Sequence, residues 1–197
     1  MERNPRDSRL RYTKKCLYES FLGFLAEKPV SDITVIEICA RAGVSRKTFY
    51  KHYTDPFDLL RCMQDDLFED YRDSLEGQVP EASHIAPILI RFVSDNRVLV
   101  KAVFENRGEG NFVDRILDDL YGVYADAWQQ ANPNLSESDV ETLFYFVVSG
   151  LFGLVRHWLF NHPETPVDDV IGQAADMMLL ADPHRAEAFA AAQNTRR

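Results

Sequence analysis

The sequence predicts an all-α protein, and two observations carry that prediction. Several long stretches place apolar residues three, four or seven positions apart, which is the spacing of one face of a helix. No stretch shows the alternation of apolar and polar residues between turn residues that is typical of paired strands. The hydrophobic share, 46% of 197 residues, is that of a globular chain able to bury a core without disulfides or metals.

The first helices can be bounded from proline, glycine and capping residues. We expect residues 1–8 to form an unstructured basic arm, followed by an amphipathic helix that ends before Pro29, because proline cannot continue a helix. Thr34 or Asp32 offers the N-cap of a second helix, which we expect to end at Gly43 in a left-handed conformation. The apolar positions of the first helix are Leu10, Leu17, Phe21, Phe24 and Leu25.

Two more helices precede a boundary in the middle of the chain. Ser45 is placed as the N-cap of a short helix that runs to about His52. Asp55 and Pro56 have the form of an N-cap and a first-turn proline that open a long helix. The helical pattern ends at residues 76–84, EGQVPEASH, where we place the boundary between the two halves of the chain. The apolar side of this long helix is formed by Phe57, Leu60, Met63, Leu67, Phe68 and Tyr71.

The second half of the chain predicts further helices joined by short loops. Ser136 and Asp139 have the arrangement of a capping box at the start of the most apolar helix. Residues 182–197 are helix-prone but poorly anchored. The expected helices are 84–96 with 98–106, as one or two units, then 113–132, about 137–161, and 166–181.

Charge is divided unevenly along the chain. Residues 1–53 hold 11 Lys and Arg against 6 Asp and Glu, whereas the remaining residues hold 11 against 25. A basic head on an acidic body indicates that the head binds a polyanion. The three cysteines, Cys16, Cys39 and Cys62, are widely spaced and include no C-x-x-C pair. They therefore argue against a disulfide framework or a zinc site, and they fit a reducing, intracellular setting.

Residues 34–53 have the anatomy of a helix-turn-helix. The first helix ends at Ala42-Gly43, where glycine makes the tight turn, and Val44 fills the angle between the two helices. Phe49 is the apolar anchor of the second helix. A helix of about seven residues is roughly 10 Å long. That size suits the DNA major groove, which is roughly 12 Å wide.

The residues around the anchor suit DNA. With Phe49 turned inward, Arg46 and Lys47 can address guanine edges or phosphates, and Thr48 can meet a thymine methyl group. A solvated charged helix face is the alternative. The turn, cap and anchor residues around the basic cluster favour DNA binding instead. The candidate DNA-binding residues are Thr34, Ser45, Arg46, Lys47, Thr48, Tyr50, Lys51 and His52.

The stretch ITVIEICARAGVSRKTFYKHYTDPFDLL resembles the DNA-binding domain of the TetR family of transcriptional repressors. The likeness covers roughly residues 9–70. It implies a homodimer whose two recognition helices, residues 45–51, enter successive major grooves of a palindromic operator in double-stranded DNA. By position, Thr34, Tyr50 and His52 match residues that contact phosphate. Arg46, Lys47, Thr48 and Lys51 match base-facing or variable positions.

Two residues depart from the family pattern. Cys39 stands where the family usually has alanine, which exchanges one small residue for another. Pro56 stands where the family commonly has a lysine that contacts the DNA backbone. That contact is lost, and proline has no N–H group to replace it. Lys51, or an arm residue such as Arg9 or Arg11, is the expected substitute.

The second half of the chain is expected to dimerise and to hold an effector. The resemblance implies that the helices over 137–161 and 166–181 form a four-helix bundle with the partner subunit. FVVSGLFGLVRHWLFN is also similar to the C-terminal domains of TetR-type regulators related to dihydroxyacetone kinase operons. Aromatic residues at helical spacing are usually plain core, but a small-molecule effector pocket would lie among them. The candidate lining is Phe92, Phe104, Tyr121, Tyr124, Trp128, Phe144 and Trp158.

These observations predict a cytoplasmic, homodimeric transcriptional repressor released by a small-molecule effector. The domains are expected to be 1–53, arm and helix-turn-helix; 54–79, connecting helix; and 80–197, dimerisation and effector binding. The apolar run 143–155 is too short to span a bilayer, so no membrane partner is expected. No nucleophile and base stand at an informative spacing, so we expect neither an enzyme nor a metal or other cofactor. The alternative is a helical protein-interaction module whose helix-turn-helix has lost DNA binding.

Overall fold

The computed structural model describes residues 5–75, 85–105, 112–131 and 133–181; within these ranges the side chains of 5–9, 131 and 178–181 are not described. The prediction of an all-α fold is confirmed, because the described residues form α-helices and one 3-10 turn, with no strand among them. The helix α1 begins at Pro5, so the expectation of an unstructured arm was wrong for residues 5–8. Proline suits the first position of a helix, because its fixed φ is already helical.

The helices follow the expected order. In the first half they are α1 (Pro5–Leu25), the 3-10 turn η1 (Val30–Asp32), α2 (Val35–Ala42), α3 (Arg46–Phe49) and α4 (Pro56–Leu75). In the second half they are α5 (Ile85–Asp95), α6 (Arg97–Glu105), α7 (Phe112–Ala131), α8 (Glu137–Asn161) and α9 (Val167–Ala181). The stretch expected to form one or two helices after the boundary forms two, α5 and α6.

The described helices fall into two compact units. The first holds α1, α2, α3, the part of α4 up to Tyr71, and α6 from Val98. The second holds α5, α7, α8 and α9. The predicted helix-turn-helix, residues 34–53, therefore belongs to the first unit, and the apolar helix α8 belongs to the second.

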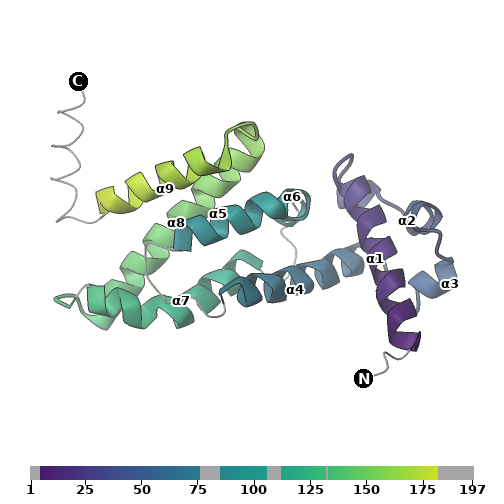
Figure 1. The fold of residues 1–197 in the computed structure, drawn as a ribbon, viewed down its shortest axis with the longest axis horizontal. Coiled ribbons are helices and arrows are strands. Elements are labelled where there is room, and N and C mark those ends of the chain that lie inside the picture. The colour runs from purple at the N-terminus through teal and green to yellow at the C-terminus, as the bar shows by residue number, and fades with distance from the viewer. Residues whose placement is uncertain (1–4, 76–84, 106–111, 132, 182–197) are drawn as a thin grey trace. The chain divides into compact units, whose positions relative to one another are not determined.

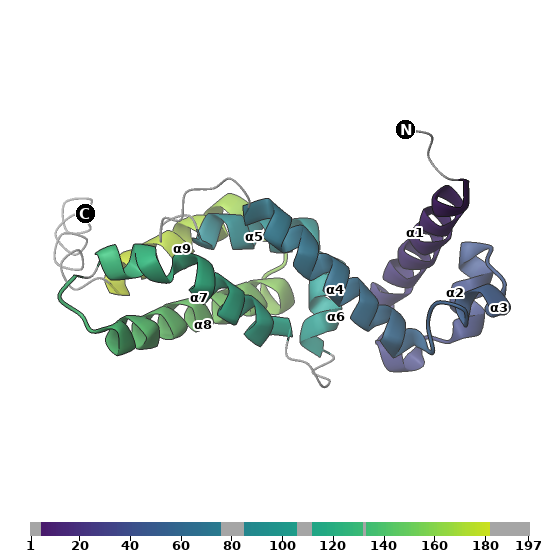
Figure 2. The same cartoon turned by 90° about the horizontal axis from the view of Figure 1, so that it is seen from below.

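The first unit is built around aromatic and aliphatic side chains from four helices. α1 packs against α2, and α2 packs against α3 (Figure 2). Leu17 and Phe21 of α1, Ile38 of α2, Phe49 of α3 and Leu59 of α4 are each 0% exposed. Burying a side chain of this size contributes roughly 1.5–3 kcal/mol. The short helix α3 is thus held by its one buried residue, although four residues alone would not form a stable helix.

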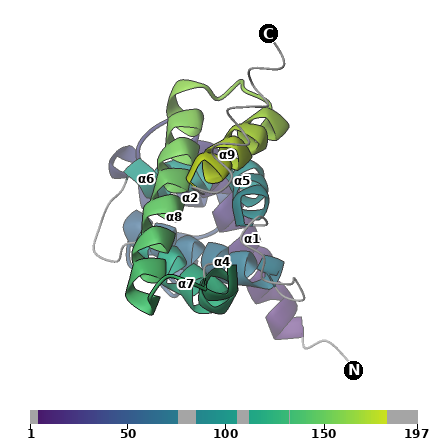
Figure 3. The ribbon, with the colours of Figure 1, turned by 90° about the vertical axis from the view of Figure 1, so that its left-hand side faces the viewer.

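The second unit pairs its helices side by side. α7 lies along α8, and α5 lies along α9 (Figures 1 and 3). Phe144, Val148, Val155 and Leu159 place one side of α8 fully inside the core. The opposite side stays open, since Phe146 is 74% exposed.

Among the described residues, α8 is the one helix long and apolar enough to cross a membrane by length and composition alone. The prediction that the 13-residue run 143–155 is too short to span a bilayer took no account of the full helix α8, which has 25 residues. The core helix of a soluble protein passes the same test. α8 buries one side against neighbouring helices and leaves the other side exposed.

Candidate nucleic-acid interface

Gly43 makes the turn between α2 and α3. Its φ of 65° and ψ of 28° are left-handed, and it is the one residue with positive φ in the described part of the chain. Its N–H and that of Val44 both donate to the carbonyl of Cys39, the latter at 3.0 Å. Only glycine adopts this conformation without a steric penalty, so the sequence stops α2 here and redirects the chain.

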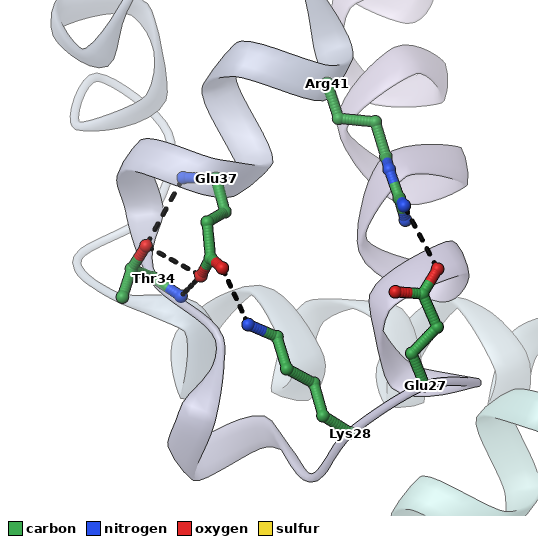
Figure 4. A network of polar contacts seen from close by, with 5 residues as sticks. All are labelled: Glu27, Lys28, Thr34, Glu37 and Arg41. Carbon is green, nitrogen blue, oxygen red and sulfur yellow. Dashed lines mark hydrogen bonds and ion pairs between the residues drawn. The ribbon is translucent and has the colours of Figure 1, made fainter.

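A complete capping box begins α2. The Glu37 amide donates to Thr34 Oγ1 at 3.3 Å, while the Thr34 amide donates back to Glu37 Oε2 at 2.9 Å. The Thr34 hydroxyl also donates to Glu37 Oε2, at 2.8 Å. Lys28 Nζ forms an ion pair with Glu37 Oε1 at 2.7 Å (Figure 4). Sequence reasoning missed Glu37 and Lys28, although the spacing Thr-x-x-Glu is the signature of this motif.

This arrangement predicts a pH effect on stability. Hydrogen bonds from Lys28 and then from Thr34 lower the pKa of Glu37 from 4.5 to about 2. The folded state therefore favours the carboxylate. Its contribution is complete above about pH 5 and is lost as the pH falls towards 2. Glu37→Gln should flatten this part of the pH dependence of the unfolding free energy, measured with urea between pH 7 and pH 2.5.

The control for that measurement is Glu69→Gln, which removes an exposed carboxylate from α4. It should keep the wild-type slope over the same range. If the Glu37 variant loses stability on acidification as steeply as the wild type, the capping box does not make the expected contribution.

The helix α3 presents the basic residues around a buried anchor. Ser45 Oγ accepts the Thr48 amide at 3.1 Å, as its predicted N-cap role requires. Phe49 is 0% exposed, and the ring of Tyr53 lies 5.6 Å from it, centroid to centroid. Thr48 is half-buried. The exposed side chains are Arg46, Lys47, Tyr50, Lys51 and His52.

The regular part of α3 is shorter than expected. It ends at Phe49, and residues 50–52 continue as a hydrogen-bonded turn. The reason is local, because the amides of His52 and Tyr53 both donate to the Phe49 carbonyl at 2.9 Å. The sequence signal for the end of this helix is weak, since no glycine or proline stands before Pro56.

The start of α4 carries negative charge. Asp55 Oδ1 accepts the Asp58 amide at 2.8 Å, which confirms Asp55 as the N-cap, and Pro56 is the first helical residue. Asp58 Oδ2 accepts the Thr54 amide at 2.7 Å, and this bond lowers the pKa of Asp58. Two carboxylates thus flank Pro56, which stands where the family pattern would place a lysine.

Five basic residues of the first unit are tied to carboxylates of the same unit. These ion pairs are Lys14–Asp66, Lys15–Glu19, Lys28–Glu37, Arg41–Glu27 and Arg61–Asp58. By contrast, Arg46, Lys47 and Lys51 are exposed, and among the described residues no carboxylate pairs with them. The recognition segment, defined as residues 45–52, therefore directs its positive charge to solvent.

The aromatic residues expected to line an effector pocket lie in separate places. Tyr121 and Trp128 of α7 surround Phe144 of α8, with ring centroids 5.2 and 5.4 Å from it. Tyr124 is buried on the same helix α7. Tyr145 stacks at 5.7 Å from Tyr121, and its hydroxyl donates to Asp118. This cluster joins α7 to α8.

The remaining candidates do not belong to that cluster. Trp158 lies 14 residues beyond Phe144, or about 21 Å along α8. Its indole N–H donates to the Thr165 carbonyl at 3.0 Å, and the Arg97 guanidinium lies 4.5 Å from its ring centroid. Phe92 lies half-buried on α5, whereas Phe104 belongs to the first unit.

Comparison with known proteins assigns the chain to a family. Residues 81–179, half of the chain, match the family model of the TetR-type transcriptional regulator C-terminal region. The chain belongs to the TetR family of transcriptional regulators. The resemblance noted in residues 9–70 is thus confirmed from a separate part of the chain. TetR-family regulators bind DNA and dimerise, and the family and the similar solved structures are transcriptional regulators rather than enzymes.

Individual relatives agree with the TetR assignment. The chain is 29% identical over 123 residues to the uncharacterized HTH-type transcriptional regulator YxbF of Bacillus subtilis (strain 168), covering 58% of this chain. The match spans only 31% of the length of that protein.

Solved TetR-like structures share the fold. The dihydroxyacetone kinase operon activator DhaS is 15% identical, with a TM-score of 0.62, over 85% of this chain and 94% of its own. The fatty acid degradation regulator FadR from Bacillus halodurans is 13% identical, with a TM-score of 0.63, over 94% and 99%.

Proposed function

We propose that this regulator binds a palindromic DNA operator as a homodimer, with one recognition segment in each of two successive major grooves. The observation that carries the proposal is the set of three exposed cations, Arg46, Lys47 and Lys51, around the buried anchor Phe49. Lys14, Lys28 and Arg41 elsewhere in the unit are paired internally, whereas this segment keeps three cations available for phosphates and base edges.

Within the recognition segment, the position of the buried Phe49 indicates which side chains face the bases. Lys47 precedes Phe49 by two residues, which is roughly 200° around a helix. Its side chain therefore points away from the core that holds Phe49. Lys47, with Arg46 and Thr48, is proposed to contact base edges. Tyr50, which is 59% exposed, and His52 are proposed to contact phosphate.

Thr34 and Ser45 act in this proposal mainly by fixing the starts of α2 and α3. Both donors of Thr34 are engaged by Glu37, so a phosphate contact from Thr34 requires exchange of that carboxylate for DNA. Ser45 Oγ likewise lies 2.9 Å from Thr48 Oγ1 while it caps α3. Their side chains hold the segment in the geometry that its cations need.

The dimer is proposed to form through the open sides of α8 and α9. Phe146, Gly150 and Gly153 follow one another on one face of α8, and all three are exposed. A Cβ added at either glycine would meet no atom within 4 Å. Met177 of α9 is 62% exposed. An apolar face with small residues permits close approach of a second copy, which fits the dimers of the family.

We further propose that the regulator represses transcription and that a small molecule bound in the second unit releases it. We place the proposed site beside the cluster of Tyr121, Trp128 and Phe144, where α7 meets α8. Two observations favour other outcomes. The solved relative DhaS is described as an activator, so activation is the alternative direction. The carboxylates of Asp55 and Asp58 favour a protein-interaction module as the alternative function.

A salt titration tests DNA binding itself. The protein should bind a duplex from upstream of its own gene at low salt, measured by fluorescence anisotropy. Six cations in a dimer predict that the logarithm of the binding constant falls with the logarithm of salt concentration at a slope of about −5. A protein that binds neither this duplex nor random DNA at low salt is not the proposed DNA regulator, and the interaction module then becomes the better description.

A further inference from the structure

Arg41 lies in the last turn of α2 and spans the gap to α1. Its guanidinium carbon lies 3.8 Å from the ring centroid of Phe24. Its Nη2 donates to Glu27 Oε1 at 3.0 Å (Figure 4). A planar cation thus rests on an aromatic face while a carboxylate holds its edge, which is an arrangement that lysine cannot reproduce.

Gly23 provides the space that this arrangement needs. A Cβ built on Gly23 would lie 2.6 Å from Arg41 Nη1, closer than real Cβ atoms come to other atoms. Gly23 sits inside α1, where glycine is less favourable than alanine. Its φ is not in the left-handed region, so the backbone does not require glycine there. The space that Arg41 needs gives a physical reason for glycine at this position.

We propose that Gly23, Phe24, Glu27 and Arg41 form a clamp that sets the orientation of the recognition segment. Arg41 is two residues from Gly43, where the hydrogen bonds to Cys39 join α2 firmly to the turn before α3. A rotation of α2 on α1 is therefore passed to α3. Arg41 is a positioning residue, which acts through α2 without touching DNA. This inference rests on the proposed DNA-binding function.

The clamp predicts the opposite of the usual effect of replacing a glycine in a helix. Gly→Ala at a compatible helical position normally stabilises a protein. Here a Cβ at Gly23 must displace Arg41 Nη1, and we expect the guanidinium to shift from its place on the Phe24 ring. Gly23→Ala and Arg41→Ala should each lower the ratio of operator affinity to random-duplex affinity, roughly tenfold for coupled residues. The slope of affinity with salt should stay at its wild-type value, because no phosphate contact is lost.

The experiment is a double-mutant cycle measured by anisotropy at 25 °C on variants shown by their melting curves to be folded. In the Arg41→Ala background, Gly23→Ala should have no further effect on the affinity ratio. Gly122→Ala on α7 is the matched control, because a Cβ there meets no atom within 4 Å. It should leave the ratio unchanged.

Three results would overturn the clamp: an unchanged ratio in Arg41→Ala, a salt slope that falls with Arg41→Ala, or a Gly23→Ala effect that persists in the double variant. If the wild type binds no duplex, the proposed function fails, and the clamp is judged separately by amide hydrogen exchange. Faster exchange in α2 and α3 in both single variants then supports it, and unchanged exchange refutes it.

Discussion

Replacing Lys47 by alanine is expected to weaken operator binding about 5- to 150-fold, which corresponds to the 1–3 kcal/mol of one lost base contact. Lys47 is exposed, no described carboxylate pairs with it, and it lies opposite the buried Phe49. Binding to random duplex should fall less, because non-specific binding depends on the total charge rather than on base edges. Competition anisotropy with operator and random duplexes measures both affinities.

The comparison variants separate base reading from charge. Lys15→Ala removes the same charge from an exposed residue of α1 that pairs with Glu19, and it should change affinity little. Tyr50→Phe and His52→Ala should lower affinity for operator and random duplex alike, as loss of a phosphate contact does. An equal loss on all duplexes for Lys47→Ala as well would refute the division of roles within the recognition segment.

Replacing Phe146 by aspartate is expected to produce a folded monomer. The side chain is 74% exposed in the single chain, so the second unit should tolerate the change. In the proposed dimer, two copies of Phe146 become buried. Losing roughly 2 kcal/mol from each copy raises the dissociation constant on the order of a thousandfold. Sedimentation velocity at micromolar concentration measures the state of association, and circular dichroism reports the fold.

Phe144→Asp is the matched variant on the other side of the same helix. Phe144 is 0% exposed and contacts Tyr121 and Trp128, so a carboxylate there should unfold the second unit. Gly150→Glu provides a second interface variant, because the position is exposed and open. Unchanged dimers for both Phe146→Asp and Gly150→Glu would place the interface elsewhere.

Local signals made much of the DNA-binding head predictable from the sequence. Ser45 and the pair Asp55-Pro56 fix helix starts through bonds to residues at most three positions away. Gly43 fixes a helix end through its own φ. Such features need no knowledge of the rest of the fold, so a sequence shows them directly.

Features that depend on distant packing could not be predicted in the same way. Arg41 and Gly23 are 18 positions apart, and nothing in either residue type indicates that one makes room for the other. α8 is apolar around almost its whole circumference. Its sequence therefore does not show which of its phenylalanines are buried, as Phe144 is, and which are exposed, as Phe146 is. The candidate effector-pocket residues lie in separate places for the same reason. Helical spacing of aromatic residues indicates core positions, but it does not show which of those side chains contact one another.

The acidic start of α4 has a consequence for how such a regulator searches a chromosome. Each phosphate that a protein neutralises strengthens its hold on every stretch of DNA, whatever the sequence. With Pro56 where the family pattern offers a lysine, and with Asp55 and Asp58 beside it, a dimer of this chain lacks the two lysine contacts expected at these helix starts. Fewer molecules are then held by the millions of unrelated sites that compete with an operator. We expect the missing charge to weaken binding to DNA in general and to leave a larger free pool that can occupy the operator.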